Sequence, residues 1–384
     1  MHQKSPDDTP QSGGWYAVIA SSGVLSLALL GDALIYAVLP VHAAAFGIGL
    51  GWVGILLSAN RIVRVFAYGW IARLSHRIGY RNACIGATLG AVISTALYGL
   101  ADGPYLLLLA RVMWGLAYAT LVMVTLAYAV TDRASVGVRV GWSRAVQRAG
   151  PIVALTGGAW LVGLLGPRET FVWLAVLTAA ALPLALSLPR QQLAEEPTST
   201  SRSLARPRLI DGIFALQGAG VDGVFAVSIT LVLAQTMPTE LAVALGGTLL
   251  AMRHAGEAVA SPIFGTLADR YGANRIFVVS LAMTGVGFVG VASGFTILGA
   301  VLMLIFRGAL AVLGPAVIVQ AASKDAPVMG DLANMQAWRD LGAAAGPTIT
   351  GFALALVSAE LLHGVVAVLL AMALVAWVRH YPWR

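Results

Sequence analysis

GTLADRYGANR, residues 265–275, is a short polar turn between two long apolar segments, and it decides the fold. A weaker copy, ARLSHRIGYRN, occupies residues 72–82. Aligning Gly79 with Gly272 gives an offset of 193 residues, about half of the 384-residue chain. Further landmarks recur at an offset of 196: Arg111 and Arg307, Trp142 and Trp338, and Gly150-Pro151 and Gly346-Pro347. The chain is therefore expected to contain two copies of one unit.

The composition predicts that this unit is embedded in lipid. Hydrophobic residues make up 59% of the chain, charged residues make up 11%, and the mean hydropathy is +0.83. A soluble domain carries about 25% charged residues, so this chain has too little polar surface for a water-soluble globule. The pI near 9.8 does not indicate nucleic-acid binding, because the arginines are scattered between apolar runs. The single Cys84 excludes an intramolecular disulfide, and no zinc-ligand spacing is present.

Twelve segments are apolar and long enough to cross a bilayer as helices, which takes about 20 residues each. They form two groups of six, separated by a stretch rich in Pro, Ser, Thr, Glu and Arg that is expected to be a solvated linker. The expected parts are a cytoplasmic tail at 1–14, a six-helix bundle at 15–188, the linker at 189–208 and a second bundle at 209–384. The expected spans are 15–40, 51–74, 82–101, 104–131, 140–166, 169–188, 209–236, 239–268, 275–294, 296–322, 334–357 and 360–379.

The distribution of positive charge predicts the orientation. Fifteen Lys and Arg residues flank the spans on one side, and only Arg168 lies on the other. Because cytoplasmic loops carry the excess of Lys and Arg, both termini are expected in the cytoplasm. The polar start of the chain, with Asp7 and Asp8, is unlike a cleavable signal peptide. Arginine outnumbers lysine 22 to 2, a bias associated with GC-rich bacteria, so the expected location is a bacterial inner membrane.

Twelve spans in two halves, with a Gly-x-x-x-Asp-Arg-x-Gly turn between the second and third span of a half, resemble the major facilitator superfamily. The resemblance covers residues 15–379. It implies an all-α membrane protein of twelve transmembrane helices in two pseudo-symmetric six-helix bundles. In that family the turn is a conformational latch that holds the halves together in the outward-open state. The corresponding residues here are Asp269, Arg270 and Gly272 in the second half, and His76, Arg77 and Gly79 in the first.

The physical chemistry of these residues fits a latch. Gly272 permits a tight turn, Asp269 can accept hydrogen bonds from a neighbouring helix N-terminus, and Arg270 can pair with an acid across the halves. In the first half His76 replaces the acid. We therefore expect the latch to be stronger in the second half.

Two further elements are similar to elements of this family. Arg111 with Trp114 and Gly115 resembles an arginine-glycine element that is linked there to proton-coupled transport. Gly150 and Pro151 resemble part of the exporter signature, whose fuller form has a glycine pair closer to the proline, so export is favoured. Gly346 and Pro347 repeat the pattern, and both pairs are expected to act as helix hinges. Ordinary close packing of membrane helices also explains such glycines.

Eight ionisable residues are singled out because they fall well inside the expected spans. Each costs at least about 2.5 kcal/mol at the bilayer centre, so they are expected to face a wet cavity or one another. They are Asp32, Arg61, Arg64, Arg111, Asp222, Arg253, Glu257 and Arg307. Asp32 lies eight residues before Pro40 at the outer end of its span, and Arg111 lies at a similar distance from the outer end of its own. At 1.5 Å per residue both lie roughly 11–12 Å below the outer surface, so a switchable pair is expected.

Proton coupling is assigned to Asp32, Arg111, Asp222 and Glu257, with Asp32 as the first candidate for the proton and Asp222 or Glu257 next. Asp222 and Arg307 form the pseudo-symmetric pair, and Arg253 and Glu257 can form a local salt bridge because they are four residues apart. Arg61 and Arg64 then lack a counter-ion. They are expected to hold an anionic group of the substrate, unless one of them reaches Asp222 or Glu257 across the halves as a gate.

The expected substrate site combines charged and aromatic side chains. Five arginines against three acids favour an anionic or zwitterionic substrate, because arginine binds carboxylate or phosphate with two hydrogen bonds. Apolar walls are expected from aromatic and thioether residues near these charges: Tyr36, Trp114, Tyr118, Phe225 and Met252. The full expected substrate-binding set is Tyr36, Arg61, Arg64, Trp114, Tyr118, Phe225, Arg253 and Arg307.

Together these observations predict a secondary active transporter that carries out proton-coupled efflux of a small metabolite, drug or siderophore by alternating access. The expected partners are the substrate, a proton or other coupling ion and the lipid bilayer, and we expect a monomer. No cofactor, metal or nucleic acid is expected. The chain is not expected to be an enzyme, because no nucleotide-binding loop, nucleophile–base trio or metal-ligand cluster appears. The alternatives are proton-coupled uptake of an organic anion, sodium coupling or anion exchange, and a membrane scaffold or receptor without a transport cycle.

Overall fold

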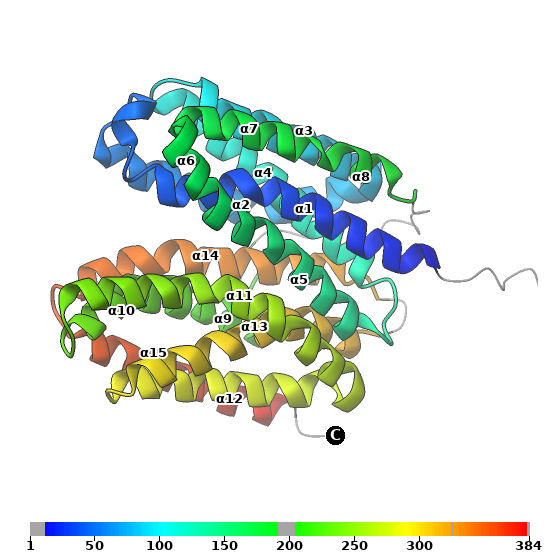
Figure 1. Cartoon of the computed structure of the whole chain (residues 1–384). Coiled ribbons are helices and arrows are strands. Elements are labelled where there is room, and N and C mark those ends of the chain that lie inside the picture. Colours follow the sequence, from blue (N-terminus) through cyan, green and yellow to red (C-terminus); the bar gives the residue numbers. More distant parts are fainter. Residues whose placement is uncertain (1–11, 191–203, 324–325, 382–384) are drawn as a thin grey trace, which may run out of the picture.

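The computed structural model describes residues 12–190, 204–323 and 326–381, and regular structure within these ranges is helical (Figure 1). The first half contains six membrane-length helical runs. They are α1 (Ser12–Val38), α2 (Leu50–Ile78), α3 (Tyr80–Leu100), α4 (Pro104–Ala129), α5 (Val136–Val153) continued by η2 (Ala154–Gly158) and α6 (Ala159–Leu165), and α7 (Pro167–Ala179) followed by α8 (Ala181–Ser187). A short helix, η1 (Ala43–Phe46), lies between α1 and α2.

The second half repeats this arrangement. Its runs are α9 (Leu209–Gln217) continued by η3 (Gly218–Phe225) and α10 (Ala226–Ala234), then α11 (Thr239–Tyr271), α12 (Ala273–Ala292), α13 (Thr296–Ala321), α14 (Met329–Ala353) and α15 (Ala359–His380). The two halves lie side by side as separate bundles (Figure 1). The twelve expected helices and their division into two bundles are therefore confirmed.

Ten of the twelve runs are long and apolar enough to cross a membrane. The remaining two, α11 and α14, are as long as the others but carry ionisable residues such as Glu257 and Asp340 along their length. These charges face the opposite half or the cavity, so protein and water solvate them rather than lipid.

Two glycines set the turns that the sequence singled out. Gly79 joins α2 to α3 with a φ of 85°, and Gly272 joins α11 to α12 with a φ of 89°. Glycine adopts positive φ at little cost, and a side chain at either position would strain the turn. The two halves thus share one turn geometry at equivalent places.

The two bundles meet along α5 with α11 and along α2 with α14. Glycine permits the first contact, because a Cβ atom on Gly137 would overlap the carbonyl oxygen of Gly265, and one on Gly141 would overlap that of Ser261. Small residues let helix backbones approach closely in this way. Most of the tail at 1–14 and of the linker at 189–208, like Lys324, lies outside the described residues, and the four-part division of the chain stays a prediction.

Candidate functional site

A cavity of about 560 Å³ lies between the two halves. Helices α1, α2, α4 and α5 line it from the first half, and η3, α11, α13 and α14 line it from the second. Among the described residues, the lining carries six arginines and four acids. They are Arg61, Arg64, Arg148, Arg253, Arg307 and Arg339, with Asp32, Asp222, Glu257 and Asp340. The described wall of the cavity therefore has two positive charges in excess when all these groups are ionised.

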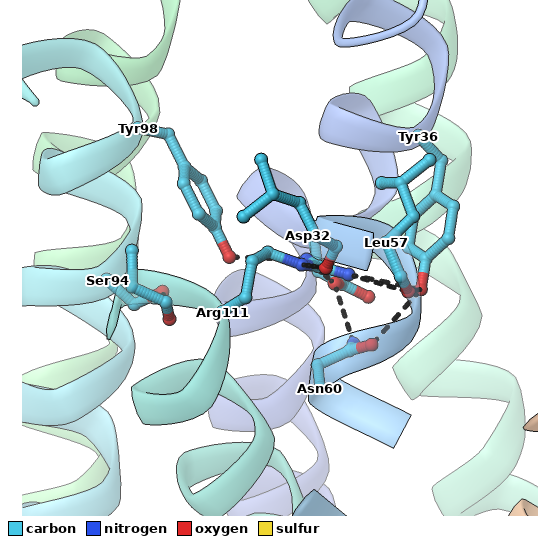
Figure 2. A network of polar contacts seen from close by, with 9 residues as sticks. Asp32, Tyr36, Leu57, Asn60, Ser94, Tyr98 and Arg111 are labelled. Atoms are coloured by element: carbon cyan, nitrogen blue, oxygen red, sulfur yellow. Dashed lines mark hydrogen bonds and ion pairs between the residues drawn. The ribbon is translucent and has the colours of Figure 1, made fainter. Parts of the chain in front are cut away.

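Asp32 and Arg111 form the ion pair that their depths predicted, with 2.7 Å between Arg111 Nη1 and Asp32 Oδ1. Figure 2 shows the network around this pair. Arg111 also donates to the hydroxyls of Tyr98, at 3.2 Å, and Tyr36, at 3.1 Å, and its Nε donates to the Leu56 carbonyl at 2.9 Å. Its side chain is only 1% exposed. Because all these partners belong to the first half, the pair is held within one bundle.

Asp222 has a nearer partner than the one expected. Arg253 Nη1 lies 2.6 Å from Asp222 Oδ1, whereas Arg307 Nη2 lies 3.8 Å from Oδ2. The expected salt bridge between Arg253 and Glu257 is therefore wrong. Asp222 belongs to the π-helix η3, and such widened turns often occur at functional sites. In this structure the turn places Asp222 beside α11, where Arg253 pairs with it instead of with Glu257.

Glu257 joins the two halves. Its Oε1 accepts from Arg148 Nη2 of α5 at 2.9 Å, and its Oε2 lies 3.3 Å from Arg307 Nη1 of α13. The side chain is 2% exposed. Arg144 and Arg339 also act on this carboxylate through their charge. One buried acid is therefore shared by arginines of both bundles.

A second ion pair crosses between α2 and α14. Arg64 Nε lies 2.8 Å from Asp340 Oδ2, and Tyr68 donates to the same oxygen at 2.9 Å. The Arg64 guanidinium also lies 4.3 Å from the centre of the Tyr118 ring. The expectation that Arg64 lacks a counter-ion is thus wrong, because Asp340 supplies one from the opposite half. Arg64 makes a cross-half contact as in the gate alternative, but its partner is Asp340 and not the expected Asp222 or Glu257.

Arg61 differs from Arg64. Its Nη1 donates to the carbonyl of Ala343 on α14 at 2.7 Å. No acid in the described part of the chain forms an ion pair with it. Arg61 therefore remains a cation without an acidic partner at the wall of the cavity.

The aromatic wall is smaller than expected. Tyr36 and Tyr118 line the cavity, but Trp114 and Phe225 do not. Trp114 is 1% exposed and packs on Tyr118 inside the first half. Phe225 is fully buried, because the wider turn of η3 means that a spacing of three residues no longer places it on the face of Asp222. Met252 is 38% exposed and lies outside the cavity lining, so this expectation is wrong as well.

Four charged residues of the site were missed in the sequence: Arg144 and Arg148 on α5, and Arg339 and Asp340 on α14. All four fall inside the spans expected at 140–166 and 334–357. The rule that a charge within a span needs a wet or charged partner applies to them as it does to the other eight. Position in the span was the signal that could have identified them.

Asp269 makes the contact expected of the latch. Its two carboxylate oxygens accept from the backbone N–H groups of Gly137, at 2.8 Å, and Val138, at 2.7 Å, at the start of α5. A carboxylate is favourable at a helix N-terminus, where N–H groups have no intrahelical partner. Nearby, Arg133 donates to three backbone carbonyls between α13 and α14.

The other latch residues behave differently. Arg270 is exposed, lies 5.3 Å from the Tyr271 ring centre, and has no acid partner among the described residues, so the expected cross-half pair is not formed. His76 is half-buried and makes no hydrogen bond within the described ranges. The contacts of Asp269 and Arg133 close the two halves at the ends of the bundles where the Gly79 and Gly272 turns lie. The structure is thus closed on that side.

Comparisons with known proteins agree with this architecture. A sequence model described as the Major Facilitator Superfamily matches residues 22–220 and 218–382. The human organic anion transporter MFSD10 (TETRAN) superposes with a TM-score of 0.73 at 15% identity, covering 96% of this chain and 100% of that chain. The E. coli fucose:proton symporter FucP gives 0.72 at 14% identity over 94% and 98%.

A bacterial homologue of the iron transporter ferroportin, in its outward-facing state, gives a TM-score of 0.69 at 14% identity over 95% of this chain and 98% of that chain. At these identities the likeness to solved structures concerns the fold. No curated protein matches the sequence.

Proposed function

The chain belongs to the major facilitator superfamily, and from that premise we propose that it is a secondary active transporter that moves a small organic anion together with protons. The excess of arginines in the cavity carries this proposal. An arginine without an acidic partner is costly in a poorly hydrated site unless an anion or water satisfies it. Arg61 and Arg339 are two such residues at the cavity wall.

Alternating access explains the two kinds of contact between the halves. With the arginine-rich ends of the helices in the cytoplasm, as the positive-inside rule predicts, the closed side is cytoplasmic and the structure is outward-facing. The Asp269 and Arg64–Asp340 contacts then hold the cytoplasmic side shut. They have to break when the bundles rock, and the cavity then opens inward.

The substrate contacts that we propose come from both halves. Arg61 of α2 and Arg339 of α14 contact the anionic group, and Tyr36 and Tyr118 form the aromatic wall. Arg64 and Arg253 have acidic partners at 2.8 and 2.6 Å, so they shape the site rather than bind the anion directly. Coupling to protons uses the buried acids and their arginines, namely Asp32, Arg111, Asp222 and Glu257.

Two observations favour different directions of transport, uptake and efflux, and we place uptake first. A proton and an anion attract one another in a shared cavity, so binding of one favours binding of the other and both travel the same way. Efflux is the second candidate, which the Gly150–Pro151 resemblance favours. Packing alone accounts for that glycine, however, because a Cβ atom on Gly150 would overlap the carbonyl oxygen of Ser26 on α1.

A scaffold or receptor without a transport cycle fits the site less well. Buried charges are expensive in a membrane protein, and a fold without a transport cycle gains nothing from a positively charged cavity. We also propose no enzymatic activity, since transport accounts for the charged groups in the cavity.

The proposal is tested by comparing metabolites inside cells and in the medium, with and without expression of the protein. We expect an organic anion to change its distribution, and to accumulate inside the cells more strongly at low external pH. Transport of a lipophilic cation instead, with no anion changed, would contradict the anionic substrate. If the anion leaves the cells instead, efflux becomes the first candidate for the direction of transport and uptake the second.

A further inference from the structure

Glu257 is the acid in shortest contact, among the described residues, with a cluster that we define as Arg144 and Arg148 of α5, Arg307 of α13 and Arg339 of α14; Arg307 also lies 3.8 Å from Asp222. Arg148 and Arg307 contact the carboxylate at 2.9 and 3.3 Å. Arg144 and Arg339 lie within its electrostatic reach. Two of these arginines come from each bundle, so the cluster spans the interface that transport has to open.

Half of this cluster has no acidic partner. Arg144 is 4% exposed, and neither it nor Arg339 makes a side-chain hydrogen bond or ion pair with any residue that the structure describes. The two guanidinium groups lie close enough to repel one another. The Nε of Arg148 is also buried without a hydrogen-bond partner in the described ranges. Among the described residues, the four cations thus have one carboxylate in short contact, and Arg144 and Arg339 form no ion pair with it.

Two other acids near Glu257 relieve this imbalance only in part. Asp222 of η3 has its short contact with Arg253 and a longer one, of 3.8 Å, with Arg307. Asp340 of α14 forms its ion pair with Arg64 and acts on Arg339 through its charge alone. His254 lies one turn from Glu257 on α11, and its buried Nδ1 has no partner in the described part of the chain. Tyr118 of α4 also faces Arg144 and Arg339. An imidazole brings no negative charge in its neutral or its protonated form, so His254 does not act as a counter-ion here.

We infer that this four-arginine cluster is the anion site of the transporter, and that Glu257 is a resident anion which the substrate replaces once Glu257 is protonated. The ionised carboxylate satisfies Arg148 and Arg307. The protonated, neutral form releases Arg148 and leaves Arg307 only its 3.8 Å contact with Asp222, and an incoming anion then contacts arginines of both halves at once. The inference rests on the proposed function. It keeps Arg339 as an anion contact, replaces Arg61 by Arg144, Arg148 and Arg307, and names Glu257 as the coupling group.

The cluster also indicates the charge of the substrate. When Glu257 is neutral, Arg148 has no ion-pair partner among the described residues and Arg307 has only the longer contact with Asp222, so these two need one negative charge. Arg144 and Arg339, which form no ion pair in the described ranges, need a second. A compact group with two negative charges, or two carboxylates on a short spacer, meets both needs, because arginine binds such groups through paired hydrogen bonds. A substrate with one negative charge leaves part of the cluster unsatisfied.

Proton and anion binding are therefore linked. Binding is reciprocal, so an anion in the cluster favours protonation of Glu257 by the same factor by which that proton favours the anion. A negatively charged substrate and a proton then occupy the site together and cross in the same direction. This linkage requires Glu257 and does not require Asp32.

Calorimetry on the purified protein tests the inference. Sulfate is the probe, since it keeps two negative charges throughout the working pH range, and methanesulfonate is the matched probe with one. For the wild type we expect sulfate to bind more tightly than methanesulfonate, more tightly as the pH falls, and with uptake of a proton. Titration in buffers of different ionisation enthalpy measures that uptake.

Glu257→Gln mimics the protonated acid. It should bind sulfate about tenfold more tightly, at the low end of the usual range for coupled sites, with no proton uptake and no pH dependence. Glu169→Gln, the same change at an exposed position on α7, should behave as wild type. Arg339→Gln should weaken sulfate binding about tenfold, and thermal unfolding without anion shows whether each variant is folded.

The inference is overturned if the wild type binds no sulfate, if its binding takes up no proton, or if folded Glu257→Gln binds sulfate no more tightly. Loss of folding in Glu257→Gln leaves the wild-type proton uptake and Arg339→Gln as the deciding measurements. Transport of an anion by a protein that fails these tests would keep the proposed function and move the site to Arg61. Sulfate binding as expected in a protein that moves no anion would instead contradict the proposed function.

Discussion

The Asp32–Arg111 pair and the Glu257 cluster bury charge in different ways. Arg111 has one acid, two tyrosine hydroxyls and a backbone carbonyl around it, all supplied by the first half. Glu257 is shared between the halves, and two of the four arginines near it have no partner among the described residues. The first arrangement is complete, whereas the second lacks negative charge.

This difference separates a structural pair from a responsive one. When rigid bundles rock, contacts within one bundle persist and contacts between bundles change. The Asp32–Arg111 distance should thus stay the same through the cycle, while the Arg148–Glu257 contact has to break. Only the Arg148–Glu257 contact can therefore link protonation to the conformation of the transporter. The depth of Asp32 had made that residue the first candidate in the sequence.

The largest effect is expected from removing the charge of Glu257, with the same change at Asp32 as the comparison. Glu257→Gln should lower proton-driven accumulation of the transported anion by roughly a hundredfold, while exchange of anion for anion persists, because the coupling free energy is lost and the site is not. Asp32→Asn should change accumulation only a few-fold. Uptake into proteoliposomes with an imposed pH gradient measures both, and equal loss in the two variants would remove the distinction between the regions.

For the stability of the protein, we expect the larger effect in the Asp32–Arg111 pair and the smaller one in the Glu257 cluster. Arg111→Gln leaves Asp32 without its cation and opens a satisfied network, so the free energy of unfolding should fall by about 3–5 kcal/mol, as for other broken buried pairs. Arg339→Gln removes a cation that has no partner among the described residues, so stability should stay the same or rise. Thermal unfolding in detergent compares them. A destabilised Arg339→Gln would mean that its charge is already satisfied.

The smallest effect is expected at the latch. Asp269→Asn weakens charge-assisted hydrogen bonds worth about 1.5–3 kcal/mol, which shifts the resting population inward, and His76→Asn should shift it much less. A cysteine at Gly247 can report the shift, because it lines the cavity and a Cβ there has no neighbour within 4 Å. Its labelling from outside, with Cys84 replaced, should fall in Asp269→Asn. Equal changes in the two variants would contradict an asymmetric latch.

The sequence predicted features that depend on regular helix geometry. The twelve spans and the Asp32–Arg111 pair follow from a constant rise per residue, and the turns at Gly79 and Gly272 follow from the conformational freedom of glycine. The contact of Asp269 with a helix N-terminus follows from its chemistry. Each of these needs only local structure or depth in the membrane.

The failures came where tertiary contacts or irregular turns intervene. Arg253 prefers Asp222 to its helical neighbour Glu257, and a partner on another helix is invisible to spacing within one helix. Phe225 lies in a π-helix, where the expected period does not hold. Asp340 shows its role only when α14 is placed against α2, since its partner Arg64 lies in the other half.

One measurement tests the central claim most directly, namely that Glu257 ties the anion to the proton. Proteoliposomes receive an inward gradient of the transported anion with no pH gradient, at a pH where the anion is fully ionised, and a dye reports internal pH. The account predicts that wild-type vesicles acidify as the anion enters, and that Glu257→Gln vesicles take up the anion with no change in pH. Alkalinisation of wild-type vesicles, or acidification that persists in Glu257→Gln, would contradict it.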